Sequence, residues 1–406
     1  MKKLFLLLIP LALISCLDND DTKNELIIDP PTIPFPPSLY GFVKTNNNFG
    51  DQMLQKLCKD ENNKNQNVTF SPYSMNMLLS MITNGASDGP QEEMLKATGM
   101  SKYGIDSLNM YNHELSTVIK AYAGAATFEA ANAAWIQDGM AVKDSFTNAM
   151  KSYYSSDVRN INFYQTEAVQ NTINEWCNEK TNGMIKKTSL EVTPDMRVVL
   201  ANATYFKGIW KQKFNKGLTH QAVFTNQSGT KSEVDMMTTE NNFFYTKTKD
   251  YESVENMQYA GSFLSMNLVL PAEGVDVDSL IGKINLGYKG TSPVKVNLTM
   301  PKFKIENHWK EFDKTLKALG ISKVMMMGDN MNRIAKDLFV SQVVQDVTVD
   351  VNEDGTEAAA VSTGGIATTS YNPNETVTIN FNRPFLFYIK ENVTGTILFM
   401  GKIANL

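Results

Sequence analysis

Disulfide bonds cannot hold this chain together, because its 406 residues include only three cysteines, Cys16, Cys58 and Cys177. Histidine is equally scarce, with three residues at wide spacings. There is no excess of positive charge: the formal net charge is −5, which argues against a nucleic-acid partner. Outside the extreme N-terminus, no apolar run reaches the roughly 18 residues of a spanning helix. These absences exclude a disulfide scaffold, a nucleic-acid-binding protein and a protein with several membrane spans.

The motifs of common enzyme classes are missing as well. There is no Cys-x-x-Cys pair, no Gly-x-Ser-x-Gly turn, no phosphate-binding loop and no dinucleotide fingerprint. His113-Glu114 lacks the second histidine of a zinc protease. The acidic turn at residues 350–355 lacks the glutamate that completes a calcium loop, since Val361 stands there. The sequence therefore predicts a protein that is not an enzyme and that needs neither metal nor cofactor.

A folded body is nevertheless expected, since 42% of the residues are hydrophobic and 20% are charged. Apolar periodicity predicts helices at residues 48–57, 74–84, 164–180 and 308–319. Runs of β-branched and aromatic residues predict strands at 198–206, 264–270, 294–300 and 343–351, and three more at 377–381, 385–389 and 397–400. No second linker or repeat interrupts residues 39–406, which we interpret as one domain. Cys58 and Cys177 are expected to be small buried residues of its core.

The N-terminus has the pattern of a targeting signal. Residues 1–15 combine two lysines, an apolar stretch and a small residue, as a signal peptide does. Leu13-Ile14-Ser15-Cys16 resembles a bacterial lipobox, which implies cleavage before Cys16 and its diacylation. The acidic stretch at residues 18–21 resembles a surface-export tag of some Gram-negative lipoproteins, or is simply the solvated start of a linker. The resemblance predicts a lipid-anchored protein of a bacterial outer membrane, surface-exposed or periplasmic.

The next stretch is rich in proline, and we interpret residues 16–38 as a tether. Five prolines fall within residues 30–37, a composition that favours extended polyproline geometry. At about 3 Å per residue, such a tether could hold a domain up to roughly 60–70 Å from the bilayer.

One segment near the C-terminus is unusual. Residues 347–351 alternate like a half-buried strand, residues 352–355 read as a turn, and residues 355–375 contain few side chains large enough to anchor them. So long a loop is usually functional or disordered. Its first half carries small residues at alternate positions, namely Thr356, Ala358, Ala360, Ser362 and Gly364. A segment with this parity could enter between two existing strands without steric conflict, leaving Glu357 toward solvent.

Residues 353–360 resemble the hinge of an inhibitory serpin, and five motifs of that family occur in order. The hinge positions are Glu353, Gly355, Thr356, Glu357, Ala358, Ala359 and Ala360. The other motifs are Phe70-Ser-Pro-Tyr-Ser74, Asn202-Ala-Thr-Tyr-Phe-Lys-Gly-Ile-Trp210, Pro384-Phe-Leu-Phe387 and Leu398-Phe-Met-Gly-Lys402. The resemblance covers the chain from about residue 40 onward. It implies a mixed α+β serpin fold with three β-sheets, eight or nine helices and an exposed reactive-centre loop at about residues 353–383.

The resemblance also implies a mechanism. A serine endopeptidase, or alternatively a cysteine endopeptidase, attacks the loop and forms an acyl-enzyme, and the cleaved loop then inserts into the main sheet and carries the trapped enzyme with it. The alternative is a non-inhibitory serpin that acts as a binding or structural protein. Such members often have proline or bulky charged residues in the hinge, whereas this chain has Thr356 followed by Glu357 and three alanines. The sequence therefore favours a monomeric inhibitor whose partners are target proteases.

The position of the scissile bond is set by loop length in inhibitory relatives. Counting Glu353 as the first residue, the seventeenth is Thr369, which places the bond at Thr369–Ser370. The segment up to Pro384 is about four residues longer than in typical relatives, so Tyr371–Asn372 is the alternative. A threonine suits enzymes with small specificity pockets, of elastase or subtilisin type, and papain-like enzymes are further candidates. Trypsin-like targets are disfavoured because residues 356–381 contain no lysine or arginine.

The family also implies a gate beneath the insertion site, formed here by Ser71, Asn202 and Gln345. Many relatives carry a histidine where this chain has Gln345. A glutamine can donate and accept hydrogen bonds at once, but it lacks the protonation response of histidine. Trp210 is expected at the top of the sheet, where insertion begins, and it also serves as a core aromatic residue.

Overall fold

The computed structural model describes residues 36–285, 292–310, 312–356 and 376–406. The α-helices in these ranges are α1 (Pro37–Lys59), α2 (Pro72–Gly85), α3 (Asp88–Ala97), α4 (Gly104–Ala123), α5 (Asp144–Tyr154), α6 (Thr166–Lys180) and α7 (Phe312–Ala318). The strands are β1 (Val68–Phe70), β2 (Thr127–Gln137), β3 (Asp157–Ile161), β4 (Val198–Ile209), β5 (His220–Thr225), β6 (Lys231–Lys247), β7 (Tyr251–Gln258), β8 (Leu264–Pro271), β9 (Val294–Pro301), β10 (Phe303–Trp309), β11 (Gln345–Asn352), β12 (Gly355–Thr356), β13 (Thr376–Asn380), β14 (Phe385–Glu391) and β15 (Ile397–Ile403).

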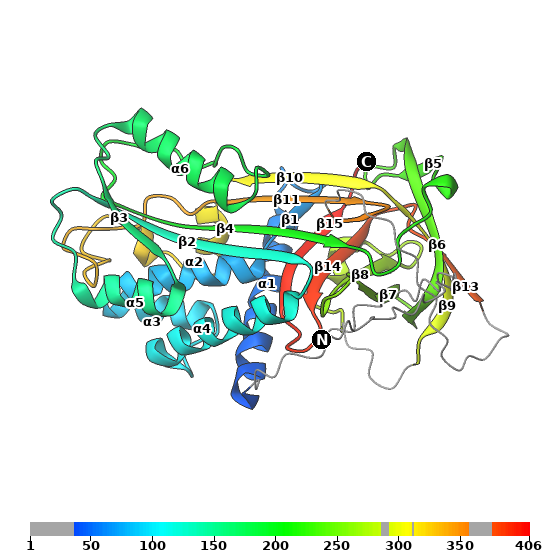
Figure 1. Cartoon of the computed structure of the whole chain (residues 1–406), viewed down its shortest axis with the longest axis horizontal. Coiled ribbons are helices and arrows are strands. Elements are labelled where there is room, and N and C mark those ends of the chain that lie inside the picture. The colour runs from blue at the N-terminus through cyan, green and yellow to red at the C-terminus, as the bar shows by residue number, and fades with distance from the viewer. Residues whose placement is uncertain (1–35, 286–291, 311, 357–375) are drawn as a thin grey trace, which may run out of the picture.

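A six-stranded sheet runs along the long axis of the molecule, in the order β10-β11-β12-β4-β2-β3 (Figure 1). Helix α6 covers one face of this sheet, and α2 lies against the other. Along β4 the side chains alternate between the two layers: Val199 and Ala203 pack under α6, whereas Phe206 belongs to the main core. Both faces are therefore covered, and a segment entering this sheet would be buried on one side by the main core.

The second sheet has nine strands, with the path β1-β15-β14-β8-β7-β6-β9-β13 and with β5 added to β6. The expected three sheets appear as two, because β6 is 17 residues long and pairs with β7 at one end and with β9 and β5 along the rest. The described ranges contain seven α-helices and three short 3₁₀ helices rather than eight or nine helices. The fold class itself is as the sequence predicted.

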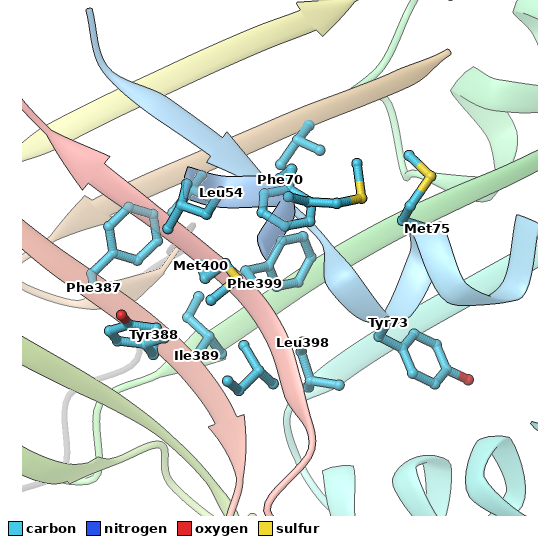
Figure 2. Close-up of a cluster of buried hydrophobic side chains, with 14 of the residues drawn as sticks. Leu54, Phe70, Tyr73, Met75, Phe387, Tyr388, Ile389, Leu398, Phe399 and Met400 are labelled. Carbon is cyan, nitrogen blue, oxygen red and sulfur yellow. The ribbon is translucent and has the colours of Figure 1, made fainter. Parts of the chain in front are cut away.

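The core forms where α1 and α2 pack against β14 and β15, and Figure 2 shows its central side chains. Leu54 of α1, Phe70 of β1 and Met75 of α2 belong to the same buried cluster as Phe387 and Phe399 of the two C-terminal strands (Figure 2). Every residue of β14 and β15 is buried, so both faces of these strands are covered, including the charged residues Lys390, Glu391 and Lys402. Their burial fixes the position of α2, which in turn lies beneath the six-stranded sheet.

Most local predictions hold, with two corrections. The helix expected at residues 308–319 is wrong at its start: His308 and Trp309 end strand β10, and α7 begins only at Phe312. Phe303 and Ile305 are buried and Lys304 is exposed, so the strand follows the alternation of residues 303–306, which outweighs the helical spacing. Helix α1 begins at Pro37, because proline is compatible with the first turn of a helix. Residues 37 and 38, which the sequence assigned to the tether, are therefore helical.

The two cysteines of the described ranges are free and buried, as expected. Burial raises the pKa of each thiol to about 12, so neither is a ready nucleophile. Within the described residues, no helix combines the length and apolarity needed to cross a bilayer.

Candidate functional site in the opening of the six-stranded sheet

Gly355 and Thr356 of the hinge lie inside the six-stranded sheet, between two strands that they separate. Strand β12 pairs with β4 on one side, Thr356 opposite Gly208, and with β11 on the other, Thr356 opposite Val351. Both pairings are antiparallel. The chain thus reverses after β11 and re-enters the sheet for two residues, beside the last residues of β4 and β11.

Beyond β12, no ladder joins β4 to β11, although both strands are fully described. A cavity of about 30 Å³ lies between them, lined by Leu200 and Asn202 of β4 and Gln345 of β11. A larger one, of about 110 Å³, lies near the start of β4 and is lined by Leu78 and Ile82 of α2. These spaces are large enough for a few waters but too small for a strand. The two strands are therefore neighbours without being paired, and they must move apart before another strand can join them.

A tight turn sets the hinge in place. The side chain of Asn352 accepts a hydrogen bond from the Asp354 backbone N–H at 3.0 Å, an Asx turn that redirects the chain. Gly355 has a φ of +155°, and a Cβ atom there would lie 2.1 Å from the Gly208 carbonyl oxygen. Only glycine fits so close to the β4 backbone. The sequence signal Asp354-Gly355 thus has a steric cause.

An aromatic cluster supports the hinge from the core. Trp210 stacks on Tyr259 with ring centroids 4.6 Å apart, and its indole N–H donates to the Asn352 carbonyl at 2.9 Å. The Tyr259 hydroxyl is 2.8 Å from the Thr356 hydroxyl, and Thr356 is only 2% exposed. Burial raises the pKa of Tyr259, so it remains a neutral hydrogen-bonding partner. Thr356 therefore occupies a closed, fully contacted site.

Charged side chains hold the turn at its outer edge. Asp354 forms ion pairs with Lys213 at 3.1 Å and with Lys216 at 2.5 Å. The hydrogen bond from Lys216 leads the effects that hold the pKa of Asp354 below its usual range. Burial raises the pKa of Glu353, but the hydrogen bond from Thr219 and the Lys302 ammonium help to outweigh it, and the net pKa is lowered. Both carboxylates are thus ionised and paired.

The predicted gate lies in the same opening, by which we mean the unpaired region between β4 and β11, farther along these strands from β12. The Ser71 N–H donates to the Gln345 side-chain oxygen at 3.0 Å, and the Gln345 amide donates to the Ser71 carbonyl at 3.1 Å. Ser71 also caps α2, accepting from the Ser74 N–H at 3.1 Å. The glutamine therefore satisfies both backbone groups of Ser71 and fastens β11 to the start of α2.

On the other strand, Asn202 fastens β4 to the same helix. Its side-chain oxygen accepts from the Ser74 hydroxyl, and its amide donates to the Asn132 side chain of β2 at 2.7 Å. No hydrogen bond between the Asn202 and Gln345 side chains appears in the described part of the chain. The predicted gate thus consists of two separate attachments to α2, one from β4 and one from β11.

The structure brings the predicted residues together in two groups. Glu353, Gly355 and Thr356 meet Trp210 at the top of the opening, and Ser71, Asn202 and Gln345 gather below it. Tyr259 was missed because it comes just after a strand end and belongs to no recognisable pattern. Ser74 was identified only as part of the Phe70–Ser74 motif, without a role at the gate. The remaining site residues lie outside the described residues: Cys16, Glu357, Ala358, Ala359, Ala360, Thr369 and Ser370.

Comparison with known proteins agrees with this geometry. A family model described as "Serpin (serine protease inhibitor)" matches residues 44–406. The chain belongs to the serpin family. Iripin-1 of the tick Ixodes ricinus is 32% identical over 373 residues, which cover 89% of this serpin and 94% of the relative. Human Serpin I2 is 32% identical over 352 residues, covering 84% and 86% respectively.

Solved structures give the same assignment. The thermophilic serpin tengpin, in its native state, superposes with a TM-score of 0.80 at 26% identity, over 92% of this serpin and 95% of tengpin. AtSerpin1 of Arabidopsis, described as a native stressed conformation, gives a TM-score of 0.77 at 26% identity, over 90% and 98%. The family as a whole generally inhibits proteases, consistent with a protein that is not an enzyme.

Proposed function

We propose that this serpin is a suicide-substrate inhibitor of serine endopeptidases, with cysteine endopeptidases as a second target class. The observation that carries the proposal is the hinge: Thr356 lies between β4 and β11, while the rest of both strands is unpaired with each other. In the proposed reaction the target enzyme acylates at the loop, and the freed upstream segment extends β12 through the opening. The enzyme is displaced and distorted before water can release it.

The pairing of β12 with β4 and with β11 predicts which residues an inserted loop would face. If both antiparallel pairings continue for six residues beyond Thr356, Ser362 comes opposite both Asn202 and Gln345, at the gate. Continued by ten, they bring Ile366 opposite Val198, the first residue of β4. Ile366 would share the inward parity of Thr356 and reach the cavity lined by Leu78 and Ile82. A small polar residue would thus meet the polar gate, and the loop's isoleucine would meet the apolar side chains of Leu78 and Ile82 in the cavity.

The position of Thr369 in the loop, and its small side chain, support a target enzyme with a small specificity pocket. An inserted segment that reaches the start of β4 would bring Thr369 just beyond the sheet, which favours cleavage at Thr369–Ser370. Threonine suits elastase-like and subtilisin-like enzymes, and papain-like enzymes are the further candidates. Ten or more new hydrogen bonds, at about 1 kcal/mol net each, would favour insertion by on the order of 10 kcal/mol before the entropy of the ordered loop is subtracted.

The proposal is tested by incubating the intact chain with pancreatic elastase and with subtilisin. We expect a covalent complex on a denaturing gel, at the mass of the enzyme plus the chain up to Thr369, and a released C-terminal fragment that begins at Ser370. A fragment that begins at Asn372 would move the scissile bond but keep the mechanism. Cleavage without any complex, across serine and papain-like proteases, would instead make this a non-inhibitory serpin.

We further propose that Cys16 carries the lipid anchor predicted from the sequence, and that residues 1–15 are removed. The supporting observation is the position of the lipobox-like residues directly before a proline-rich stretch that ends at α1. Expressed in a Gram-negative host, the wild-type chain should partition into detergent and incorporate labelled palmitate. Cys16→Ser should abolish both, whereas Cys58→Ser should retain them. Equal labelling of wild type and Cys16→Ser would refute the anchor.

A further inference from the structure

A second set of contacts joins the two sides of the opening, on the face opposite to α2. The chain leaves α6 and crosses the sheet as residues 185–192, which we call the strap, before it enters β4. Ile185 and Leu190 of the strap pack into the cluster formed by α6, β2 and β4. Both also line the cavity between β4 and β11. The strap therefore belongs to the β4 side and covers the opening from outside.

The strap is nevertheless hydrogen-bonded to β11. One oxygen of Asp346 accepts from the Thr188 hydroxyl at 2.9 Å and from the Ser189 N–H at 2.8 Å. Its other oxygen is 2.8 Å from His308 Nδ1, on the neighbouring strand β10. The Asp346 side chain is only 6% exposed, so its carboxyl group is shielded from water, whereas His308 is about half exposed. A hydrogen bond to a shielded carboxyl group is costly to lose, because the group left without its partner stays buried.

These bonds cross the line along which the sheet must part. A new strand requires β11 to move from β4 by about 4.8 Å, the spacing of neighbouring strands. His308 would move with Asp346, since β10 pairs with β11 along its whole length. The strap would stay with α6 and β4, because Asn174 and Gln170 of α6 also bond to it, through the Thr188 and Val192 amides at 3.0 Å each. The bonds from Thr188 and Ser189 to Asp346 must therefore break.

We propose that Asp346 is a positioning residue that sets the rate at which the sheet opens, by holding the strap to β11. The proposal rests on the proposed function, because opening matters only if a strand inserts. In this proposal the opening of the sheet is controlled from both faces. The Asp346 contacts to the strap act on the outer face, and the gate of Ser71, Asn202 and Gln345 acts through α2 on the inner face. Loss of the Asp346 bonds would speed insertion and make the intact form less persistent.

The test compares variants of the full chain by two readouts. Hydrogen exchange of the Ser189 amide reports the strap, and annealing of a synthetic peptide with the sequence of residues 357–369 reports opening of the sheet. Asp346→Ala should speed both by about tenfold or more, since it removes the acceptor of the Thr188 and Ser189 hydrogen bonds. Asp346→Asn, which keeps an acceptor, and Thr188→Val, which removes one donor, should give smaller increases.

Two controls separate this role from general destabilisation. Lys310→Ala removes an ion pair to Glu191 that also reaches the strap, but both side chains are more than half exposed, so both rates should stay within about twofold. Ile389→Val, in the fully buried strand β14, should lower the melting temperature without changing Ser189 exchange.

The two readouts also separate the proposal from the proposed function. Wild-type exchange rates in Asp346→Ala and Thr188→Val would overturn the role of Asp346. Faster exchange at Ser189 in a chain that neither anneals peptide nor traps a protease would support the strap contact and refute the inhibitory mechanism.

Discussion

Thr356→Arg is expected to convert the inhibitor into a substrate. The threonine side chain is 2% exposed, faces the core and contacts the Tyr259 hydroxyl, so an arginine would have to bury its charge or leave the sheet. Burying an unpaired charge costs several kcal/mol, enough to slow insertion more than a hundredfold relative to hydrolysis of the acyl-enzyme. The measurement is the ratio of covalent complex to cleaved chain on a denaturing gel, which should fall to near zero.

Matched variants at and beside this position make the test specific. Thr356→Val keeps the shape and loses only the hydroxyl, and it should still form the complex. Glu357→Arg adds the same side chain one residue later, where the strand parity points outward, and it should inhibit nearly as well as the wild type. If Thr356→Arg traps protease normally, the loop does not insert through this site.

Cleavage of the loop should raise the melting temperature of this serpin by on the order of 20 °C. The intact sheet leaves β4 and β11 unpaired below β12, whereas insertion would add about ten residues to the ladder on both sides. A gain on the order of 10 kcal/mol corresponds to such a shift, at about 2 °C per kcal/mol for a domain of this size, and it is an upper value because the entropy of the ordered loop is not yet subtracted. Calorimetry of the intact chain and of the chain nicked by a protease makes the comparison.

The same nick in Thr356→Arg provides the control, because the cut loop should remain outside the sheet. Its melting temperature should stay within a few degrees of the intact form. Equal melting temperatures for intact and nicked wild type would mean that the intact fold stores no free energy for trapping a protease.

Sequence reasoning succeeded where local patterns and tertiary structure agree. The β-branched residues of β4 and β11, the small residue Thr356, and Asp354-Gly355 each indicate a local conformation that the structure contains. The error at His308 has the opposite cause, since pairing with Asp346 of β11 decides the conformation there. The expected number of sheets was wrong because β6 pairs with β7 and also with β9 and β5, which joins these strands into one sheet. The sequence pattern does not reveal that one strand pairs with two groups of strands.

The residues that sequence reasoning missed are defined only by partners far along the chain. Tyr259 meets Thr356 across 97 positions, and Asp346 meets Thr188 across 158. Nothing next to either residue distinguishes it from an ordinary aromatic or surface acid. Such contacts arise from topology, and no local pattern encodes them.

The two paired residues of β12 also have a kinetic consequence. Starting a new central strand is the slow part of strand addition, because the chain loses loop entropy before it gains many hydrogen bonds. In this fold Gly355 and Thr356 already form that nucleus in the uncut molecule. Once the loop is cut, the strand has only to propagate from an existing end. The delay before trapping should therefore depend on how readily β4 and β11 separate rather than on a search for the correct register.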